Sequence, residues 1–380
     1  MLKLRKGGRS VKNKIIVVGF GLYLAIFSVA TLILPKKSFS QMENRVLAKT
    51  PVFSVEALIK GEFTEDIDSY LSDHIVGKDA FVKLKTNMDY LLGKKEINEV
   101  YFGKKHRYIK KFQINERQLK NNLNSINTFA KEQKDANVYF LLAPNANLIY
   151  EEDLPKFAYE ESQNKVYEMV EQEFEENITL VNPTEELMAH KKEAIYFNTD
   201  HHWTMRGAYY GYKSLMDAMK LPVKPLNEYE SSTLKEEFFG TLYSKAPKSL
   251  VKGDKIQLFY NRNTQCQVGY MNESILSNRL FALQNASIKD KYTVFLDGNH
   301  PLVRIKSNCD NNKKVLILKD SYAHCLVPFL TEQFNQIYMV DLRYFHGDLG
   351  EYMKENKIDT VIFIHNVDFL ANENSFMWLK

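Results

Sequence analysis

A four-residue segment, Asp200-His201-His202-Trp203, carries the side chains best suited to catalysis. In an extended segment Asp200 and His202 project to the same side of the backbone, whereas His201 points away from them. The Asp200 carboxylate can then fix the tautomer of the His202 imidazole and stabilise the cation that forms when the ring takes a proton. The pair is suited to general-base catalysis if a nucleophile lies within reach of the ring.

Ser321 is the candidate nucleophile, because it follows an apolar run at residues 315–318 and precedes a predicted helix that begins at about Ala323. In an open α/β sheet, residues at such strand-to-helix turns face a shared crevice at the carboxyl ends of the strands. We therefore predict that the Ser321 hydroxyl gives up its proton to His202, with Asp200 behind the ring. An ordinary helix N-cap is the structural alternative for this serine.

Two other interpretations of the Asp200 segment stay open on sequence alone. Aspartate and histidine suit divalent metals, so Asp200 with His201, His202 or both can be read as a metal site. No third ligand motif is visible nearby in the sequence, and we predict neither a metal nor a cofactor. The remaining interpretation is a structural cluster that caps the helix predicted for residues 205–219.

Short apolar runs ended by turn residues predict the strands of a sheet that is covered on both faces. Helical stretches separate the last three runs, and this alternation predicts a parallel sheet with helices on its faces, hence an α/β fold. Between about residues 222 and 311, shorter alternating runs predict an inserted, strand-rich subdomain. The predicted strands are residues 137–143, 315–318, 336–340 and 361–364, and the predicted helices between the last three are residues 323–334 and 347–356.

The N-terminus indicates where the protein works. Residues 15–34 form an uncharged apolar stretch of 20 residues, which as a helix spans about 30 Å of hydrocarbon. Six basic residues and no acid precede it, so residues 1–14 are predicted to stay cytoplasmic and the rest to lie outside. A cleaved signal peptide is the alternative, with small residues at 28–30, but the apolar stretch continues past them. We predict a transmembrane signal anchor, a spacer at residues 35–62 and an extracytoplasmic body at residues 63–380.

Composition excludes several classes of protein. The chain of 380 residues has 51 basic and 47 acidic side chains, and after residue 14 the balance is 45 to 47. A basic footprint for nucleic acid is therefore missing. The three cysteines, Cys266, Cys309 and Cys325, are too few for a disulfide framework and have no C-x-x-C spacing. A single Cys266–Cys309 bridge is left open.

Several segments together resemble a known family. The Asp200–Trp203 tetrad, the spacer residues 38–45, the strand-to-turn residues 316–322 and the segment at residues 292–301 look like the DHHW family. That family is similar to the SGNH-hydrolase-like acetyltransferase proteins of alginate acetylation. The resemblance implies an SGNH-hydrolase-like, flavodoxin-like fold with a Ser-His-Asp triad, carried here onto Ser321, His202 and Asp200. At Lys319 the sequence departs from the GDS motif, which has glycine, so the turn is expected to adapt or the activity to weaken.

The resemblance also suggests the groups around the triad. Gly298 and Asn299 match the glycine and asparagine that form an oxyanion hole in SGNH enzymes; a turn between strands at residues 293–296 and 302–305 is the structural alternative. Arg343 follows a predicted strand at the same crevice edge and is suited to a carboxylate or an acyl carbonyl, with a solvent-facing ion pair as its alternative. The residues predicted to bind substrate are His201, Trp203, Tyr322 and Arg343.

The function that the resemblance implies is a membrane-anchored, extracytoplasmic O-acyltransferase. It would move an acyl group, expected to be acetyl, through an acyl-serine to a cell-surface polysaccharide. A multi-pass membrane-bound O-acyltransferase is the expected supplier of that group. Two alternatives stay open: an esterase that removes acetyl groups from polysaccharide, and a non-catalytic glycan-binding scaffold of an acetylation complex.

Overall fold

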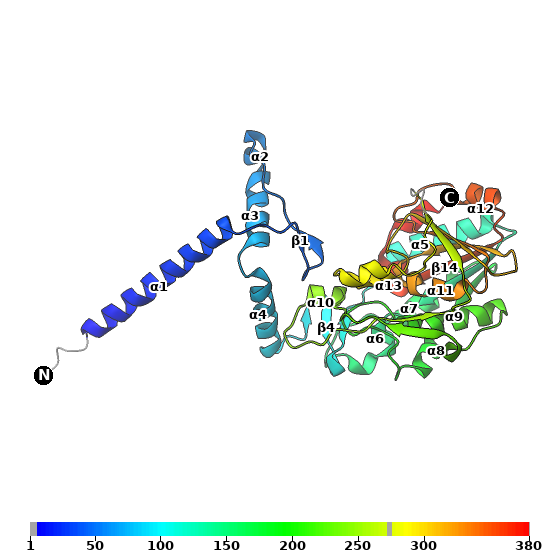
Figure 1. Cartoon of the computed structure of the whole chain (residues 1–380), viewed down its shortest axis with the longest axis horizontal. Helices are drawn as coiled ribbons and strands as arrows, with labels where there is room; N and C mark the ends of the chain where they lie inside the picture. Colours follow the sequence, from blue (N-terminus) through cyan, green and yellow to red (C-terminus); the bar gives the residue numbers. More distant parts are fainter. Residues whose placement is uncertain (1–5, 272–275, 380) are drawn as a thin grey trace. The chain divides into compact units, whose positions relative to one another are not determined.

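The computed structural model describes residues 6–271 and 276–379, and the chain divides into two compact units (Figure 1). The first unit comprises residues up to Gly93 together with Pro247–Ser249, and the second comprises Lys94–Ala246 and Leu250–Lys380. The catalytic candidates all belong to the second unit. The two helices that begin the predicted body, α3 (Glu62–His74) and α4 (Lys78–Leu91), belong to the first.

The first unit begins with α1 (Lys6–Ile33). Within the part of the chain that the structure describes, this is the one helix long and apolar enough to cross a membrane, over Lys12–Ile33. The predicted spacer contains a short antiparallel pair and a helix rather than an unstructured linker. These elements are β1 (Phe39–Ser40), β2 (Arg45–Val46) and α2 (Val55–Lys60).

A buried carboxylate joins the short strand pair to the helices of this unit. Asp73 in α3 accepts hydrogen bonds from Arg45, from Lys78 at 2.9 Å and from the backbone N–H of Ala48 at 2.8 Å. The bond from Arg45 contributes most to lowering the pKa of Asp73, and the other bonds lower it further. Burial raises this pKa, but the bonds outweigh it, so the pKa lies below its usual range. The unit therefore has its own polar core.

The second unit is built on a seven-stranded sheet in the order β10-β11-β13-β12-β14-β6-β7. The five strands from β13 to β7 run parallel, whereas β11 runs antiparallel to both of its neighbours, β13 and β10, near the other end of the sheet. All four predicted sheet strands are confirmed. The bounds are β6 (Asn137–Ala143), β7 (Ile178–Val181), β10 (Cys266–Tyr270), β11 (Leu302–Ser307), β12 (Lys314–Lys319), β13 (Gln336–Val340) and β14 (Thr360–Asn366).

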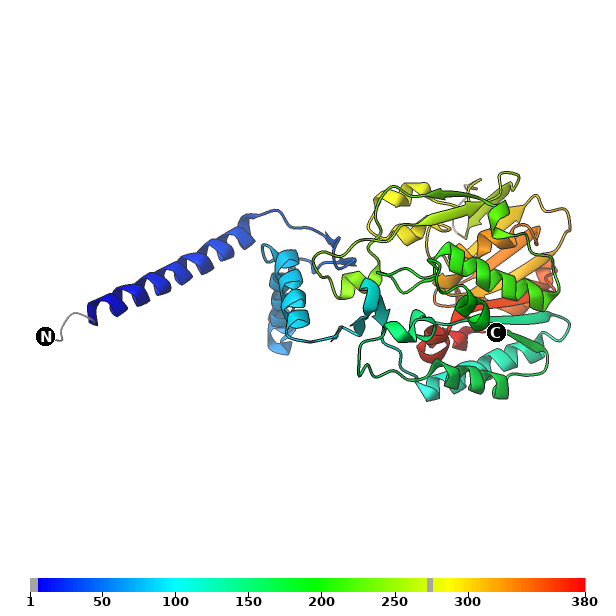
Figure 2. The ribbon, with the colours of Figure 1, turned by 90° about the horizontal axis from the view of Figure 1, so that it is seen from below.

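Alternation along β12 shows why these runs are apolar throughout. Val315 and Ile317 pack into the core on one face of the sheet, and Leu316 and Leu318 pack into the core on the other face. Helices α9 and α11 cover the first face, and α5, α7, α12 and α13 cover the second; α9 is the green helix over the orange strands in Figure 2. The bounds are α5 (Glu116–Glu132), α7 (Gln163–Glu173), α9 (Met205–Met219), α11 (Val327–Leu330), α12 (Leu349–Asn356) and α13 (Val367–Asn372).

The strand-rich segment differs in detail from its prediction. Its strands β10 and β11 extend the central sheet, and β8 (Glu230–Thr233) and β9 (Gln257–Tyr260) form a separate pair. The strand predicted at residues 293–296 is instead a 3₁₀ helix, η5 (Lys291–Val294). The helix predicted at residues 323–334 is divided into η6 (Ser321–Cys325) and a single turn, α11. The cysteines, whose pairing was left open, are free thiols.

Smaller elements complete the second unit. An antiparallel hairpin, β4 and β5, is extended by β3. The remaining bounds are β3 (Glu96–Ile97), β4 (Val100–Phe102), β5 (Tyr108–Lys110), α6 (Ala146–Ile149), α8 (Thr184–Ala189), α10 (Thr241–Lys245), and the 3₁₀ helices η1 (Lys104–His106), η2 (Glu151–Asp153), η3 (Leu226–Glu228), η4 (Leu283–Ser287) and η7 (Ser375–Trp378).

Candidate active site

Ser321 lies at the turn that leaves β12, as predicted, but it is not the residue that caps η6. The cap is Asp320, whose Oδ1 accepts the backbone N–H of Tyr322 at 2.8 Å. The other oxygen of Asp320 accepts two bonds from Asn366 at the end of β14, from the backbone N–H at 2.7 Å and from Nδ2 at 2.8 Å. Because Asp320 satisfies the turn, the Ser321 hydroxyl is left for another partner.

That partner is His202. Its Nε2 lies 2.7 Å from Ser321 Oγ, and its Nδ1 lies 2.5 Å from Asp200 Oδ1. The backbone N–H of His202 also donates to Asp200 Oδ1 at 3.0 Å. Asp200 and His202 are buried, whereas Ser321 is partly exposed. The serine hydroxyl, the imidazole and the carboxylate thus form one line of contacts, with the geometry that a general base and a nucleophile need. Ser321 and His202 are 119 residues apart in the sequence.

Local structure explains how the tetrad reaches the serine. Tyr196 and Trp203 form an isolated antiparallel bridge, which closes a loop over residues 197–202, and Thr204 then caps α9 by accepting the N–H of Gly207. The loop therefore ends at a rigid helix, which fixes the direction of the Asp200 and His202 side chains.

Two residues predicted to bind substrate instead hold the site segments together. Trp203 is fully buried and its Nε1 donates to the carbonyl of Tyr322 at 2.9 Å. The buried Tyr322 returns a bond through its hydroxyl to the carbonyl of His201. These bonds join the loop before α9 to the turn after β12. Both aromatic rings therefore position the triad, and neither faces the pocket around Ser321.

Thr241, at the start of α10, completes the environment of Asp200. Its backbone N–H and its hydroxyl donate to Asp200 Oδ2 at 2.7 and 3.0 Å. Burial raises the pKa of Asp200, but the neighbouring imidazoles and the bonds from His202 and Thr241 outweigh it, so the pKa lies well below its usual range. The carboxylate is therefore ionised at neutral pH, as the orienting acid of a triad must be.

Gly240 allows this close approach, and replacing it gives a testable prediction. A methyl group at Gly240 would lie 2.3 Å from both Cβ and Oδ2 of Asp200, while the backbone angle of −77° suits any residue. We expect Gly240→Ala to lower kcat by about 100-fold, because displacing a catalytic group by about 1 Å has an effect of that size. Turnover of an activated acetyl ester measures it. Gly350→Ala, in α12, is the control and should leave kcat as it is; an equal loss in both variants contradicts the explanation.

Tyr292 packs flat against the imidazole ring of His202. Its ring stacks on the His202 ring with centroids 3.8 Å apart and planes 6° apart. Its hydroxyl donates to the Ser321 carbonyl at 2.9 Å. One side chain thus fixes both the base and the nucleophile. The sequence placed Tyr292 in a family segment without assigning it a role, because the contact depends on η5 lying over the loop before α9.

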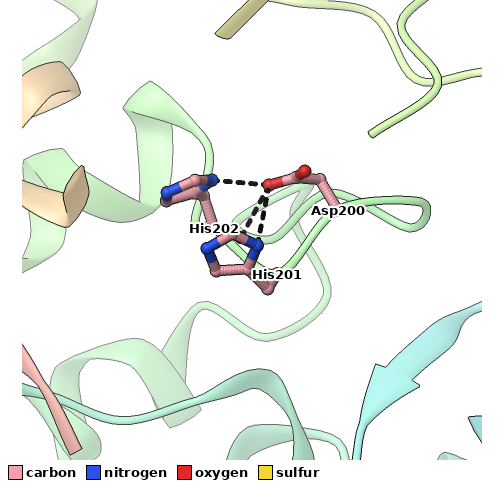
Figure 3. A group of neighbouring side chains, drawn as sticks. All are labelled: Asp200, His201 and His202. Carbon is pink, nitrogen blue, oxygen red and sulfur yellow. Dashed lines mark hydrogen bonds and ion pairs between the residues drawn. The ribbon is translucent and has the colours of Figure 1, made fainter. Parts of the chain in front are cut away.

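His201 lies beside the triad but contacts different atoms. Its Nδ1 is 2.7 Å from the Thr241 hydroxyl and 3.7 Å from Asp200 Oδ1 (Figure 3). Asp200, His201 and His202 are close enough to hold a metal ion, with ligand atoms within 4.8 Å of one another. Both ring nitrogens of His202 are, however, engaged by Asp200 and Ser321. This arrangement favours the triad over the metal interpretation.

A pocket of about 220 Å³ opens above Ser321. Two predicted substrate residues, His201 and Arg343, line it. Arg343 is held by Asp341, with Nε 2.8 Å from Oδ1 and one terminal nitrogen 2.6 Å from Oδ2. It is therefore both a pocket residue and a member of an ion pair. The other polar residues that line the pocket were not singled out from the sequence: Lys110, Asn145, Asn147, Asn366, Asp368, Asn372 and Glu373.

Among these, Asn366 had a sequence signal. It lies two residues after the strand predicted at residues 361–364 and ends the observed strand β14, on the same sheet edge as Ser321. Polar residues at that position are candidates in any open α/β sheet. Asn145 follows the strand predicted at residues 137–143 in the same way. The other residues lie on elements whose positions only the tertiary structure reveals.

Lys319 does not enter the crevice. Its side chain is buried beneath the turn, where Nζ contacts Asp341 Oδ2 at 2.7 Å, His324 Nε2 at 2.8 Å and Asn299 Oδ1 at 3.1 Å. Burial lowers the pKa of Lys319, and the Asp341 carboxylate opposes that shift. The turn therefore accommodates a side chain in place of glycine by burying it in a polar cluster under the nucleophile.

We expect Lys319→Met to lower the free energy of unfolding by about 3 kcal/mol, because it removes one partner of a buried ion pair. Asp341 would keep Arg343, but His324 would lose its donor. Urea unfolding measures the change. Lys313→Met, at an exposed position before β12, is the control and should change stability by less than about 0.5 kcal/mol. A stable Lys319→Met variant would show that the cluster contributes little.

Gly298 and Asn299, predicted to form the oxyanion hole, lie in the turn before β11. Gly298 has a positive φ of 85°, which suits glycine. The amide oxygen of Asn299 accepts bonds from Lys319 and, at 3.2 Å, from Arg343. Neither residue is among those that line the Ser321 pocket. Their oxyanion role stays a prediction, and the structure connects Asn299 to the cluster under the turn instead.

A family model described as DHHW protein matches residues 119–340. A DHHW family protein from Eubacterium siraeum has a similar structure, with a TM-score of 0.64, 26% sequence identity, and coverage of 75% of this chain and 95% of that chain. No curated protein sequence matches the chain.

PatB1 from Bacillus cereus has a similar structure as well. Its TM-score is 0.62 at 20% identity, with 73% of this chain and 98% of that chain covered. The same protein with a sulfonyl adduct gives a TM-score of 0.60 at 19% identity, covering 72% and 98%. At this identity the likeness concerns the fold alone. Together with the parallel strands of the sheet, these similarities identify the SGNH-hydrolase-like fold expected from the sequence.

Proposed function

Because the chain belongs to the DHHW family, we propose that it is an O-acyltransferase that works through an acyl-Ser321 intermediate. The observation that carries the proposal is the line of contacts from Asp200 Oδ1 to His202 Nδ1, 2.5 Å, and from His202 Nε2 to Ser321 Oγ, 2.7 Å. The family resemblance supplies the expected acyl group, acetyl, and the expected acceptor, a cell-surface polysaccharide.

The chemistry follows from these contacts. Ser321 Oγ attacks the carbonyl carbon of the acyl donor while its proton passes to His202 Nε2, and the departing donor group takes that proton. An acceptor hydroxyl then gives its proton to His202 and attacks the serine ester, and Ser321 Oγ leaves and recovers the proton. Asp200 stays ionised and holds the ring throughout.

The oxyanion needs a donor at the pocket side of Ser321, and we assign it to Asn366. One hydrogen of Asn366 Nδ2 is used by Asp320, 2.8 Å away, and the other is available because Asn366 lines the pocket. The amide oxygen is also fixed, since it caps α13 by accepting the N–H of Phe369 at 3.0 Å. A donor held at both ends is preorganised for a developing negative charge.

The remaining parts of the proposal concern location and supply. Helix α1 supports a single-pass anchor with the N-terminus in the cytoplasm and the second unit outside, because its length and composition suit a membrane span. A soluble donor such as acetyl-coenzyme A belongs to the cytoplasm. We therefore include a multi-pass membrane-bound O-acyltransferase as the partner that brings the acyl group across.

Acylation of Ser321 tests the proposal. The full chain in detergent is mixed with p-nitrophenyl acetate, and peptide mapping by mass spectrometry should find acetyl on Ser321. A sulfonyl fluoride gives a second probe, as PatB1 has been described with a sulfonyl adduct. Ser244, another serine of the same unit, is the internal control and should stay unlabelled. Folded protein with an unlabelled Ser321 contradicts the proposal.

An esterase would form the same intermediate, so a second experiment separates the two activities. Water and a sugar hydroxyl compete for one acyl-enzyme. The acetyl content of surface polysaccharide should fall in cells that lack the gene if the protein is a transferase. The acetyl content should rise in those cells if the protein is an esterase. Cells with the Ser321→Ala variant separate an enzyme from a scaffold: the acetyl content should fall as far as in deletion cells if Ser321 is the nucleophile, and it should stay normal if the protein is a non-catalytic scaffold.

A further inference from the structure

Asn145 is a buried amide without a use in the fold. It follows β6 and is 8% exposed. Its backbone N–H donates to Gln163 Oε1 at 2.9 Å, but among residues 6–271 and 276–379 no side chain or backbone group bonds its side-chain amide. It also does not cap α6, which begins at the next residue. Because Asn145 lines the pocket around Ser321, its amide is available to a ligand there.

The sheet places this amide on the far side of the pocket from the nucleophile. Asn366 in β14 is paired with Ala143 in β6, and Asn366 is also bonded to Asp320 next to Ser321. Asn145 lies two residues beyond Ala143 and lines the same pocket as Ser321. Because two strand spacings separate β6 from β12, the two strands lie roughly 10 Å apart. Asn366 is nearer to Ser321 and is the residue proposed to bind the oxyanion. Asn145 is therefore available to bind the acceptor.

Each of the two cations that line the pocket, Lys110 and Arg343, contacts a carboxylate. Lys110 Nζ lies 2.5 Å from Asp368 Oδ2, and Arg343 makes its two short contacts with Asp341. Burial, and after it the neighbouring His202 ring, lowers the pKa of His201 to about 3, so the His201 ring is neutral at neutral pH. In the described part of the chain, each cation that lines the pocket therefore already contacts a carboxylate. Glu373, which also lines the pocket, would repel a carboxylate or a phosphate.

We propose that Asn145 binds a hydroxyl of the acceptor and that the pocket takes an uncharged sugar in preference to a uronate or a phosphate-bearing polymer. This inference rests on the proposed acyl transfer. An amide offers both a donor and an acceptor, as does a hydroxyl, so the two groups match without a charge. Asn145 takes no part in bond making: it holds one hydroxyl of the acceptor while a neighbouring hydroxyl gives its proton to His202 and receives the acyl group from Ser321.

The test measures how much of the acyl group on Ser321 is transferred to the acceptor and how much is lost to water. The full chain in detergent is supplied with p-nitrophenyl acetate and either a neutral oligosaccharide or an oligouronide of the same length, at the same ionic strength. Mass spectrometry gives acetylated sugar, and total acetate gives hydrolysis. We expect the ratio of transfer to hydrolysis to be at least about tenfold higher with the neutral sugar. An oligouronide that is accepted as well or better overturns the proposal.

Variants of Asn145 test its part. We expect Asn145→Ala to lower the transfer-to-hydrolysis ratio for the neutral sugar by about tenfold, the effect of one lost hydrogen bond. Asn145→Asp keeps the shape of the side chain but removes its N–H donors, so a lower ratio in this variant as well cannot come from a cavity that disturbs folding. Asn121→Ala, on the exposed side of α5, is the matched control and should keep the ratio. If Asn145→Ala slows transfer and hydrolysis equally, Asn145 acts on the acyl carbonyl and the assignment to the acceptor is wrong.

Calorimetry separates this proposal from the proposed function. Binding of the same two oligosaccharides is measured with Ser321 unreacted, so no acyl-enzyme is needed. Weaker binding of the neutral sugar by Asn145→Ala, together with an unlabelled Ser321 in the wild-type protein, would support the sugar site and reject the enzyme. Equal binding by the variant, with Ser321 labelled normally, would reject the sugar site and leave the enzyme.

Discussion

Replacing Ser321 by alanine is expected to lower the turnover of an activated acetyl ester by about 10⁴- to 10⁶-fold, the range found when the nucleophile of a triad is removed. Ser321 Oγ is the atom that receives the acyl group in the proposed mechanism. His202, whose Nε2 lies 2.7 Å away, activates this oxygen but cannot replace it. Release of p-nitrophenol by wild-type and variant protein measures the effect.

The same substitution should leave the fold intact. The Ser321 carbonyl would keep its bond from Tyr292, and Asp320, not Ser321, caps η6. We therefore expect the midpoint of thermal unfolding to change by only a few degrees, since the variant loses a single hydrogen bond. Ser214→Ala in α9, whose hydroxyl donates to the Tyr210 carbonyl, is the matched control with normal turnover. A Ser321→Ala variant that retains a tenth of the activity requires a different nucleophile.

The central sheet was predictable because its strands are buried on both faces. Two of the four predicted runs, residues 315–318 and 361–364, contain only aliphatic and aromatic residues, and the other two differ by a polar first residue, Asn137 or Gln336. A run of that kind is apolar whichever way its side chains point. Strands at or near the ends of the sheet were harder to assign. β7 (Ile178–Val181) has four residues with an exposed Thr179, and β11 alternates buried and exposed positions because it runs antiparallel near the end of the sheet. Only pairing with β13 shows that β11 belongs to the main sheet.

The triad was predictable from two separate local patterns. The spacing of Asp200 and His202 placed both on one side of the chain, and Ser321 followed a strand whose carboxyl end must face the crevice. The residues that support them have no such pattern. Thr241 lies on a five-residue helix and Tyr292 on a 3₁₀ helix, and each reaches the site because of tertiary packing.

Lys319 shows the limit of a motif comparison. The sequence records that a lysine replaces the glycine of the GDS motif, which indicates a side chain near the nucleophile. It does not record the direction of that side chain. The structure buries it against Asp341, an acid that follows the next strand, β13. The consequence of the replacement therefore depends on a partner 22 residues away, and motif spacing alone contains no information about it.

The two adjacent histidines give the second prediction with a large effect. We expect His202→Ala to lower kcat by about 10⁴- to 10⁶-fold, because Ser321 then loses its general base and the proton has no acceptor. His201→Ala should lower kcat by no more than about tenfold, since His201 contacts the Thr241 hydroxyl and the pocket but not Ser321 Oγ. Steady-state turnover of an activated acetyl ester measures both, with circular dichroism to establish that each variant is folded.

This pair of variants also distinguishes the triad from a metal site. In a triad the two imidazoles are unequal, because only His202 contacts both the Asp200 carboxylate and Ser321 Oγ. Figure 3 shows the two rings beside Asp200. In a metal site with Asp200, both rings would be ligands, and losing either would lower activity and metal content together. Equal losses in the two variants, accompanied by loss of a divalent metal measured by atomic absorption, would therefore favour the metal. A large difference without a change in metal content leaves the proton transfer to His202 as the explanation.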